Sequence, residues 1–301
     1  MAATQAAPRG AFEISLPSGR TLALGARTLV MGILNVTPDS FAGGVTDPDE
    51  AAEAALRMEA EGADILDVGG ESTRPGAHPL SEREELARVL PVFQRLKDRL
   101  RIPISIDTYK AGVAGVAIEA GACIVNDISG LGYDPMLGGV VAQTGVGLVL
   151  MHTRGRSRDM YRDATYDDVL AEVSAELEQA LARAVAAGVS REQVILDPGI
   201  GFAKRAEHSL ALVAKLSDLA SLGRPLLVGP SRKSFLAEAI GTLPPAERDW
   251  GTAAAVTAAV LAGAHIVRVH GVAAMVQVVR VADAIRQQAG GADAARWSSR
   301  G

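Results

Sequence analysis

The chain has 301 residues, of which 48% are hydrophobic and 22% charged, and this balance is typical of a globular protein with a full core. With 30 basic and 35 acidic residues the formal charge is -5, and no long basic stretch indicates a nucleic-acid partner. The single cysteine, Cys123, excludes an intrachain disulfide.

An alternating segment at 11–24 comes first along the chain, and the turn signal Pro17-Ser18-Gly19 divides it, which predicts a β-hairpin. After the hairpin, short continuous apolar runs alternate with stretches of helical character. Such runs are typical of strands buried on both faces of a parallel sheet. We expect eight of these strands, at 29–34, 64–68, 103–106, 123–125, 147–151, 194–196, 225–228 and 265–269.

Helical segments lie between the apolar runs, and several carry end signals. Ser81 with Glu84 three residues later has the pattern of a capping box. Four glycines stand where the left-handed residue after a helix is expected, namely Gly62, Gly121, Gly188 and Gly263. Examples of the expected helices are 48–61, 81–100, 166–187 and 250–262.

Eight successive β-then-α units predict an α/β fold, a (β/α)8 TIM barrel over residues 29–289. The alternative is an open doubly wound sheet, which requires a reversal of strand order that a sequence cannot display. In the barrel, residues 1–28 would form a tail and a hairpin that closes the bottom. The Gly-, Ser- and Ala-rich segment 290–301 is expected to be a disordered tail.

Two segments bear on location. The first ten residues lack the apolar core of a signal peptide. The most apolar stretch, 253–267, contains polar residues, so we interpret it as a buried helix that runs into a strand and not as a membrane span. We therefore expect a cytoplasmic protein with no membrane partner.

Polar side chains follow all eight expected strands. Singly, each has an ordinary explanation as a turn former, a helix cap or a solvated loop residue. In barrel enzymes the chemistry lies where the strands end, and structural needs alone give no reason to place ligand-binding side chains after every strand. The segments in question are 35–44, 69–76, 107–108, 126–127, 151–152, 197–199, 229–234 and 268–271.

These polar side chains divide into two chemical groups. One combines acceptors with a cation and suits a flat heterocycle that offers N–H donors on one edge and a carbonyl on another. The other suits an anion such as a phosphate. The first group is Asp107, Asn126, Asp197 and Lys233, and the second is Asn35, Arg268 and His270. No His or Cys cluster has metal-ligand spacing, which disfavours purely metal-based chemistry.

Together, the segments resemble the dihydropteroate synthase family of the folate pathway. The matching stretches are MGILNVTPDSF (31–41), DVGGESTRPGA (67–77), SIDT (105–108), NDISG (126–130), LMH (150–152), LDPGIGF (196–202), GPSRKS (229–234) and GAHIVRVHGV (263–272). The resemblance implies a homodimeric, Mg²⁺-dependent transferase and sulfonamide target. Such an enzyme joins p-aminobenzoate to 6-hydroxymethyl-7,8-dihydropterin diphosphate and releases pyrophosphate.

The resemblance also implies roles for individual residues. The pterin would contact Asp107, Asn126, Met151, Asp197 and Lys233. The diphosphate would contact Asn35, Thr73, Arg268 and His270, with Asn35 as the Mg²⁺ ligand. The p-aminobenzoate side would contain Phe41, Thr73, Arg74, Pro75, Phe202 and Ser231. The catalytic set would be Asp107, Lys233, Arg268 and His270, with no general base, because an aryl amine is already neutral at pH 7.

One loop departs from the family pattern, which usually has an aspartate after the phenylalanine; here Phe41 is followed by Ala42. This leaves open a non-catalytic paralogue that binds pterin. A second alternative is a barrel like methyltetrahydrofolate methyltransferase, which shares the pterin carboxylates and asparagine. That class has no need of Arg268 and His270 or of the 231–234 stretch.

Overall fold

The computed structural model describes residues 7, 9–37, 44–74, 76–162 and 164–289. The expected hairpin is present, because β1 (Phe12–Ser15) pairs antiparallel with β2 (Thr21–Leu24) across the short 3-10 turn Pro17–Gly19. The eight expected strands are also present. They are β3 (Leu29–Asn35), β4 (Ile65–Gly69), β5 (Ile104–Asp107), β6 (Ile124–Asp127), β7 (Gly147–Met151), β8 (Val194–Asp197), β9 (Leu227–Val228) and β10 (Ile266–Val269).

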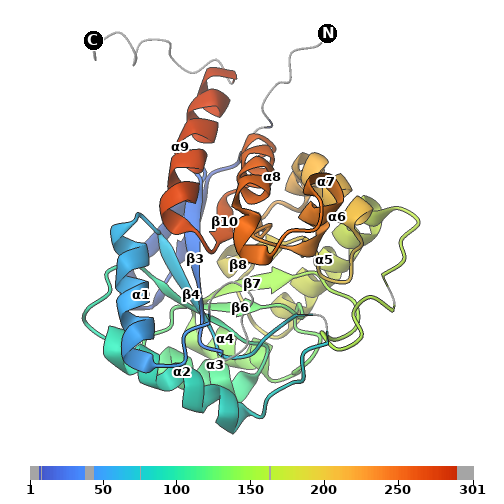
Figure 1. The fold of residues 1–301 in the computed structure, drawn as a ribbon. Coiled ribbons are helices and arrows are strands. Elements are labelled where there is room, and N and C mark those ends of the chain that lie inside the picture. Colours follow the sequence, from blue (N-terminus) through green and yellow to red (C-terminus); the bar gives the residue numbers. More distant parts are fainter. Residues whose placement is uncertain (1–6, 8, 38–43, 75, 163, 290–301) are drawn as a thin grey trace, which may run out of the picture.

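The eight strands form one parallel sheet in the order β8-β7-β6-β5-β4-β3-β10-β9. Its two ends meet, because Leu196 of β8 forms a parallel bridge with Leu226 and its N–H donates to the Pro225 carbonyl at 2.9 Å. Strands consecutive in sequence are thus neighbours around the ring, without the reversal that an open doubly wound sheet requires. The prediction of a (β/α)8 barrel is confirmed (Figure 1).

Helices alternate with the strands along the chain and lie around the barrel (Figure 1). The capping box is present, with Ser81 Oγ accepting from the Glu84 N–H and the Glu84 carboxylate accepting from the Ser81 N–H at 3.0 Å. The four glycines predicted to follow helices all have positive φ. The described helices are α1 (Pro48–Ala60), α2 (Glu82–Leu96), α3 (Ala111–Glu119), α4 (Leu137–Thr144), α5 (Val169–Ala186), α6 (Ala206–Ala214), α7 (Ala237–Ile240), α8 (Asp249–Leu261) and α9 (Val272–Ala289). Across the described ranges, none of these helices is both long and apolar enough to cross a membrane.

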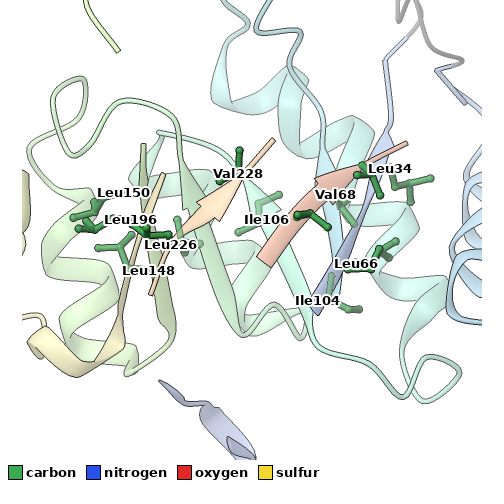
Figure 2. Close-up of a cluster of buried hydrophobic side chains, with 14 of the residues drawn as sticks. Leu34, Leu66, Val68, Ile104, Ile106, Leu148, Leu150, Leu196, Leu226 and Val228 are labelled. Carbon is green, nitrogen blue, oxygen red and sulfur yellow. The ribbon is translucent and has the colours of Figure 1, made fainter. Parts of the chain in front are cut away.

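Alternation along the strands divides their side chains between two cores. Leu66 and Val68 of β4 belong to the larger core, which lies between the strands and the helices (Figure 2). Ile65 belongs to the second core, which contains inward side chains near the beginnings of the strands and the buried face of the hairpin. Its fully buried or nearly buried members include Ile14, Leu16, Leu22, Leu24, Met31, Ile65, Ile124, Val149, Ile195, Leu227 and Ile266.

The second core fixes where polar side chains can lie. The hairpin and inward residues of seven of the eight strands, all except β5, fill the N-terminal end of the barrel with apolar groups. A residue two positions further along a strand points to the same interior but lies closer to the C-terminal end. Asp67, Asn126, Met151, Asp197 and Arg268 each follow a member of the second core by two positions.

Candidate active site

A cavity of about 490 Å³ opens where the strands end, a volume within the usual range for a small-molecule site. Its lining comes from several strand ends and the loops that follow them. From the predicted site residues it includes Asn35, Thr73, Arg74, Asp107, Phe202, Ser231, Lys233, Arg268 and His270. Nine predicted residues, far apart in sequence, therefore meet in one cavity.

Three predicted pterin residues lie outside the cavity lining. Asn126, Met151 and Asp197 are buried at the ends of β6, β7 and β8, with 4%, 4% and 6% of their surfaces exposed. Their positions on the inward face place them deeper than the residues of the loops. Phe41 and Pro75 lie outside the described residues, as does most of the altered first loop.

Two buried aspartates at strand ends, Asp127 and Asp197, point to opposite sides of the sheet. Asp197 Oδ1 accepts from the Gly199 N–H at 2.7 Å, and Asp127 Oδ1 accepts from the Ser129 N–H at the same distance. Asp127 follows the inward Asn126 by one residue and therefore points to the opposite side of β6. Its second oxygen accepts from the Leu131 N–H at 2.5 Å. Asp197 is on the inward side, and within the described ranges its second oxygen has no hydrogen-bond partner in the protein.

Arg268 joins two carboxylates inside the barrel. Its Nε donates to Asp67 Oδ2 at 2.6 Å, and its Nη2 donates to Asp107 Oδ2 at 2.7 Å. Asn126 Nδ2 donates to the same Asp67 oxygen at 3.0 Å. Asp67 was not selected from the sequence, although a charged residue at an inward position of an apolar run was a usable signal, because a buried carboxylate requires partners.

Burial brings the pKa values of two groups in the site to about 7. It raises the pKa of Asp107 to about 7, against the opposing effect of the Arg268 charge. It lowers the pKa of Lys233 to about 7, partly offset by Asp197. Burial also raises the pKa of Asp197. Groups shifted in this way within a cavity can exchange protons with a ligand near pH 7, which is typical of functional sites.

Two lysines contact the loop after β8. Lys233 Nζ donates to the Ile200 carbonyl and lies 4.2 Å from the centre of the Phe202 ring. Lys204 is buried, and its Nζ donates to the Phe202 carbonyl at 3.0 Å and to His152 Nδ1 at 2.7 Å. The ring of Phe202 is thereby fixed in the cavity wall. Lys204 was not predicted as a site residue.

Ser231 and His270 are in direct contact. The Ser231 hydroxyl lies 3.0 Å from His270 Nδ1 and accepts from the His270 backbone N–H at 3.2 Å. Burial and the Arg268 charge lower the pKa of His270 to about 3, so its ring is neutral at pH 7. The sequence assigned these residues to different ligands, whereas the structure makes them one unit of the cavity wall.

Part of the lining comes from segments that the sequence did not indicate. Met160 and Tyr161, between β7 and α5, face the cavity, as do Pro245 and Arg248 before α8. The segment with Met160 is also rich in arginine, and Arg154 in it forms ion pairs with Glu172 and Glu176 of α5. Nothing in the local sequence pattern distinguishes Met160 or Tyr161 from other loop residues.

The fold and the site define a class of protein, a (β/α)8-barrel enzyme with a polar ligand cavity at the C-terminal ends of its strands. A family model described as pterin binding enzyme matches residues 31–270. The chain is 48% identical to a dihydropteroate synthase from Synechocystis over 277 residues, which cover 91% of this chain and 96% of that protein.

Solved structures agree with this match. The chain superposes with a TM-score of 0.87 on a Yersinia pestis dihydropteroate synthase in complex with a sulfonamide drug, at 40% identity, covering 92% of this chain and 100% of that one. A Xanthomonas albilineans dihydropteroate synthase with 4-aminobenzoic acid gives a TM-score of 0.84 at 41% identity, covering 92% and 99%. The chain belongs to the pterin binding enzyme family and, within it, to the dihydropteroate synthases.

Proposed function

We propose that this chain condenses 6-hydroxymethyl-7,8-dihydropterin diphosphate with p-aminobenzoate to give 7,8-dihydropteroate and pyrophosphate. The observation that carries the proposal is the collection of Asp107, Lys233, Arg268 and His270 around one ligand-sized cavity in a chain of this family. The transferase activity follows from membership among the dihydropteroate synthases.

The pterin half of the site is assigned to the deep residues. A pterin ring offers N–H donors on one edge, and the second oxygen of Asp197 together with Asp107 supplies charged acceptors for them. Lys233 supplies a donor for the ring carbonyl. Asn126 and Met151 are equally buried on neighbouring strands, and Met151 can pack against a flat ring.

The diphosphate half is assigned to the ends of β3 and β10, which are paired neighbours in the barrel. Arg268 and His270 provide donors from β10, while Asn35 on β3 and Thr73 after β4 line the same cavity. These donors face the place where negative charge develops on the leaving pyrophosphate, which is where fixed donors accelerate a reaction most.

A magnesium ion fits this half through Asn35. Among the described residues, no group of three His, Cys, Asp or Glu side chains could hold a metal by itself. A single amide oxygen from the protein suits Mg²⁺, which commonly binds through few protein oxygens together with ligand phosphates and waters. When bound, the ion would neutralise phosphate charge, and the Asn35 amide oxygen would be its protein ligand.

The arylamine half is assigned to the outer wall, where Thr73, Arg74, Phe202 and Ser231 line the cavity. The cationic Arg74 suits a carboxylate, and the Phe202 ring suits an aromatic ring. Phe41 and Pro75 belong to this half of the proposal by the family pattern. Occupation of the same wall by a sulfonamide is expected, since a related enzyme has been solved with such a drug.

The chemistry then requires positioning more than proton abstraction. The amine nitrogen forms a bond to the methylene carbon, the bond from that carbon to the diphosphate oxygen breaks, and the proton lost by the amine passes to water or to the released pyrophosphate. Asp107 and Asp197 hold the pterin ring. This ring shares the positive charge that develops on the methylene carbon when the diphosphate leaves. Because the amine is neutral, alignment of the two substrates and stabilisation of the leaving group supply most of the rate.

The deciding experiment measures pyrophosphate release from the dihydropterin diphosphate, with and without p-aminobenzoate and Mg²⁺. Release that depends on both, with dihydropteroate formed, supports the proposal. Release without dihydropteroate formation contradicts it. Pterin binding without release identifies a non-catalytic paralogue, in line with the missing loop aspartate, and methyl transfer from a folate donor identifies the methyltransferase alternative.

Two further parts of the proposal concern the protein in solution. We expect a homodimer, by analogy with the family. We expect it in the cytoplasm because the single cysteine gives no sign of an oxidising compartment. Light scattering of the purified protein at two concentrations measures the first, and cell fractionation the second. A monomer at micromolar concentration would contradict the homodimer.

A further inference from the structure

We propose that Asp67 is a positioning residue for both halves of the site, because it fixes the amide of Asn126 in the pterin half and the guanidinium of Arg268 in the diphosphate half. This inference rests on the proposed function and adds a residue that does not itself line the cavity.

Asp67 connects strands that do not touch each other. It lies on β4, while Asn126 lies on β6 and Arg268 on β10, each two strands away around the ring in opposite directions. Asp67 Oδ2 accepts from Asn126 Nδ2 at 3.0 Å and from Arg268 Nε at 2.6 Å. Such bonds are possible only through the interior of the barrel, where Asp67 is completely buried.

The first consequence concerns the direction of the Asn126 amide. An asparagine side chain can present either its oxygen or its NH₂ group to a ligand, and its hydrogen bonds decide between the two. With one Nδ2 hydrogen donated to Asp67, the orientation of the amide is fixed and its Oδ1 acceptor points away from Asp67. Asp67 thus determines where Asn126 presents its acceptor, which matches the N–H donors of a pterin edge.

The second consequence concerns Arg268. The contacts with Asp67 and Asp107 use Nε and Nη2, and the planar group is then held by carboxylates from two different strands. In the part of the chain that the structure describes, the donors on Nη1 make no such contact and remain for an anionic ligand. Asp67 therefore sets the orientation in which Arg268 meets the diphosphate.

The third consequence concerns the charge on Asp107. The pKa of this carboxyl responds to the Arg268 cation on β10 and to the carboxylates of Asp67 on β4, Glu85 on α2 and Asp127 on β6, and Asp107 in turn raises the pKa of Lys233. Asp67 raises the pKa of Asp107 and competes with it for the same guanidinium. Removal of the Asp67 charge would lower the pKa of Asp107.

The test compares Asp67→Asn with Asp64→Asn. Asp64 directly precedes β4, accepting from the Val30 N–H at 2.9 Å and from Arg27 at 2.8 Å, and makes no contact with the site. Affinity for the dihydropterin diphosphate is measured by calorimetry, and turnover is measured from pH 5 to pH 9. We expect Asp67→Asn to weaken binding at least tenfold and to move the acid limb of the pH profile to lower pH. Asp64→Asn should do neither.

An unchanged affinity and an unchanged acid limb in Asp67→Asn would overturn the inference, as would an equal effect in Asp64→Asn. Asp67→Ser is a second variant in case the isosteric one does not fold; it should lose affinity to a similar extent. Failure of the proposed function is distinguishable, because it would be seen in the unmodified protein, which would neither bind the dihydropterin diphosphate nor release pyrophosphate.

Discussion

The hydroxyl of Ser231 lies 3.0 Å from Nδ1 of His270 and also accepts from the backbone N–H of His270. The hydroxyl can also donate its own hydrogen to Nδ1, because the ring of His270 is neutral at pH 7. In that arrangement the ring carries its proton on Nε2, and this N–H is available to a diphosphate. We therefore expect Ser231 to favour the tautomer of His270 that donates from Nε2.

Ser231→Ala should consequently lower turnover. Loss of one hydrogen bond of this kind costs about 1 kcal/mol, which corresponds to a decrease of roughly fivefold in kcat/KM for the dihydropterin diphosphate. Ser234→Ala is the matched control, since Ser234 lines the same cavity. Steady-state kinetics of both variants make the measurement, and equal effects would refute the role assigned to Ser231.

Asp197→Asn should weaken pterin binding. A hydrogen bond to a charged acceptor contributes about 1.5–3 kcal/mol, so affinity should fall between about 10-fold and 150-fold. Asp127→Asn is the control, because both residues are buried aspartates that accept from the N–H two positions later. Asp127 faces away from the interior, so its variant should lose stability and retain pterin affinity by calorimetry. A normal affinity in Asp197→Asn would contradict the assignment.

Pterin-diphosphate affinity should be greatest near pH 7. Binding favours ionised Asp107 and protonated Lys233, and both have a pKa of about 7 in the free site. As pH falls below 7, protonation of Asp107 competes with binding, and the raised pKa of Asp197 adds to this limb. As pH rises above 7, loss of the Lys233 proton weakens binding.

Variants separate the two limbs. Lys233→Met should remove the alkaline limb and keep the acid one, whereas Asp107→Asn should weaken the acid limb and keep the alkaline one. Calorimetry between pH 5 and pH 9 measures both. An alkaline limb that persists in Lys233→Met would show that another group titrates there.

Ile14→Ala should destabilise the barrel without changing the site. Ile14 is completely buried in the core shared by the hairpin and the strand beginnings. Truncation of a buried isoleucine costs about 2–5 kcal/mol of the free energy of unfolding. Thr21→Ala, at an exposed position of the same hairpin, is the control. Urea unfolding gives the free energies, and KM values should be unchanged in both variants.

Most of the fold was predictable because local signals agreed with the global arrangement. The apolar runs from Leu29 to Val269 marked every strand, and the Ser81–Glu84 pair marked the beginning of α2. Closure of the barrel depends on the bridge between Leu196 and Leu226, which no local sequence pattern indicates. The family resemblance and the enzyme class were confirmed by the comparisons.

The sequence predicted which residues line the site better than it predicted the contacts between them. Positions after the strands selected nine residues that line the cavity, but position alone could not show that Asn126, Met151 and Asp197 lie below it. The contact of Asp67 with Arg268 joins β4 and β10, which are not neighbours in the sheet, across the interior of the folded barrel. Tyr161 reaches the cavity from a loop, and its Oη lies 3.5 Å from the Gly201 carbonyl. No periodic pattern in the sequence indicates this contact.

The hairpin of β1 and β2 has a kinetic consequence. Because it fills the N-terminal end of the barrel, both substrates must arrive, and both products must depart, through the C-terminal rim. Asn126, Met151 and Asp197, which we assign to the pterin, are buried and lie outside the cavity lining, whereas the described residues assigned to the arylamine line the cavity. An arylamine in place would cover the pterin subsite. We therefore expect the substrates to bind in a fixed order, pterin diphosphate before arylamine, and a tight arylamine competitor to trap the enzyme with its first substrate bound.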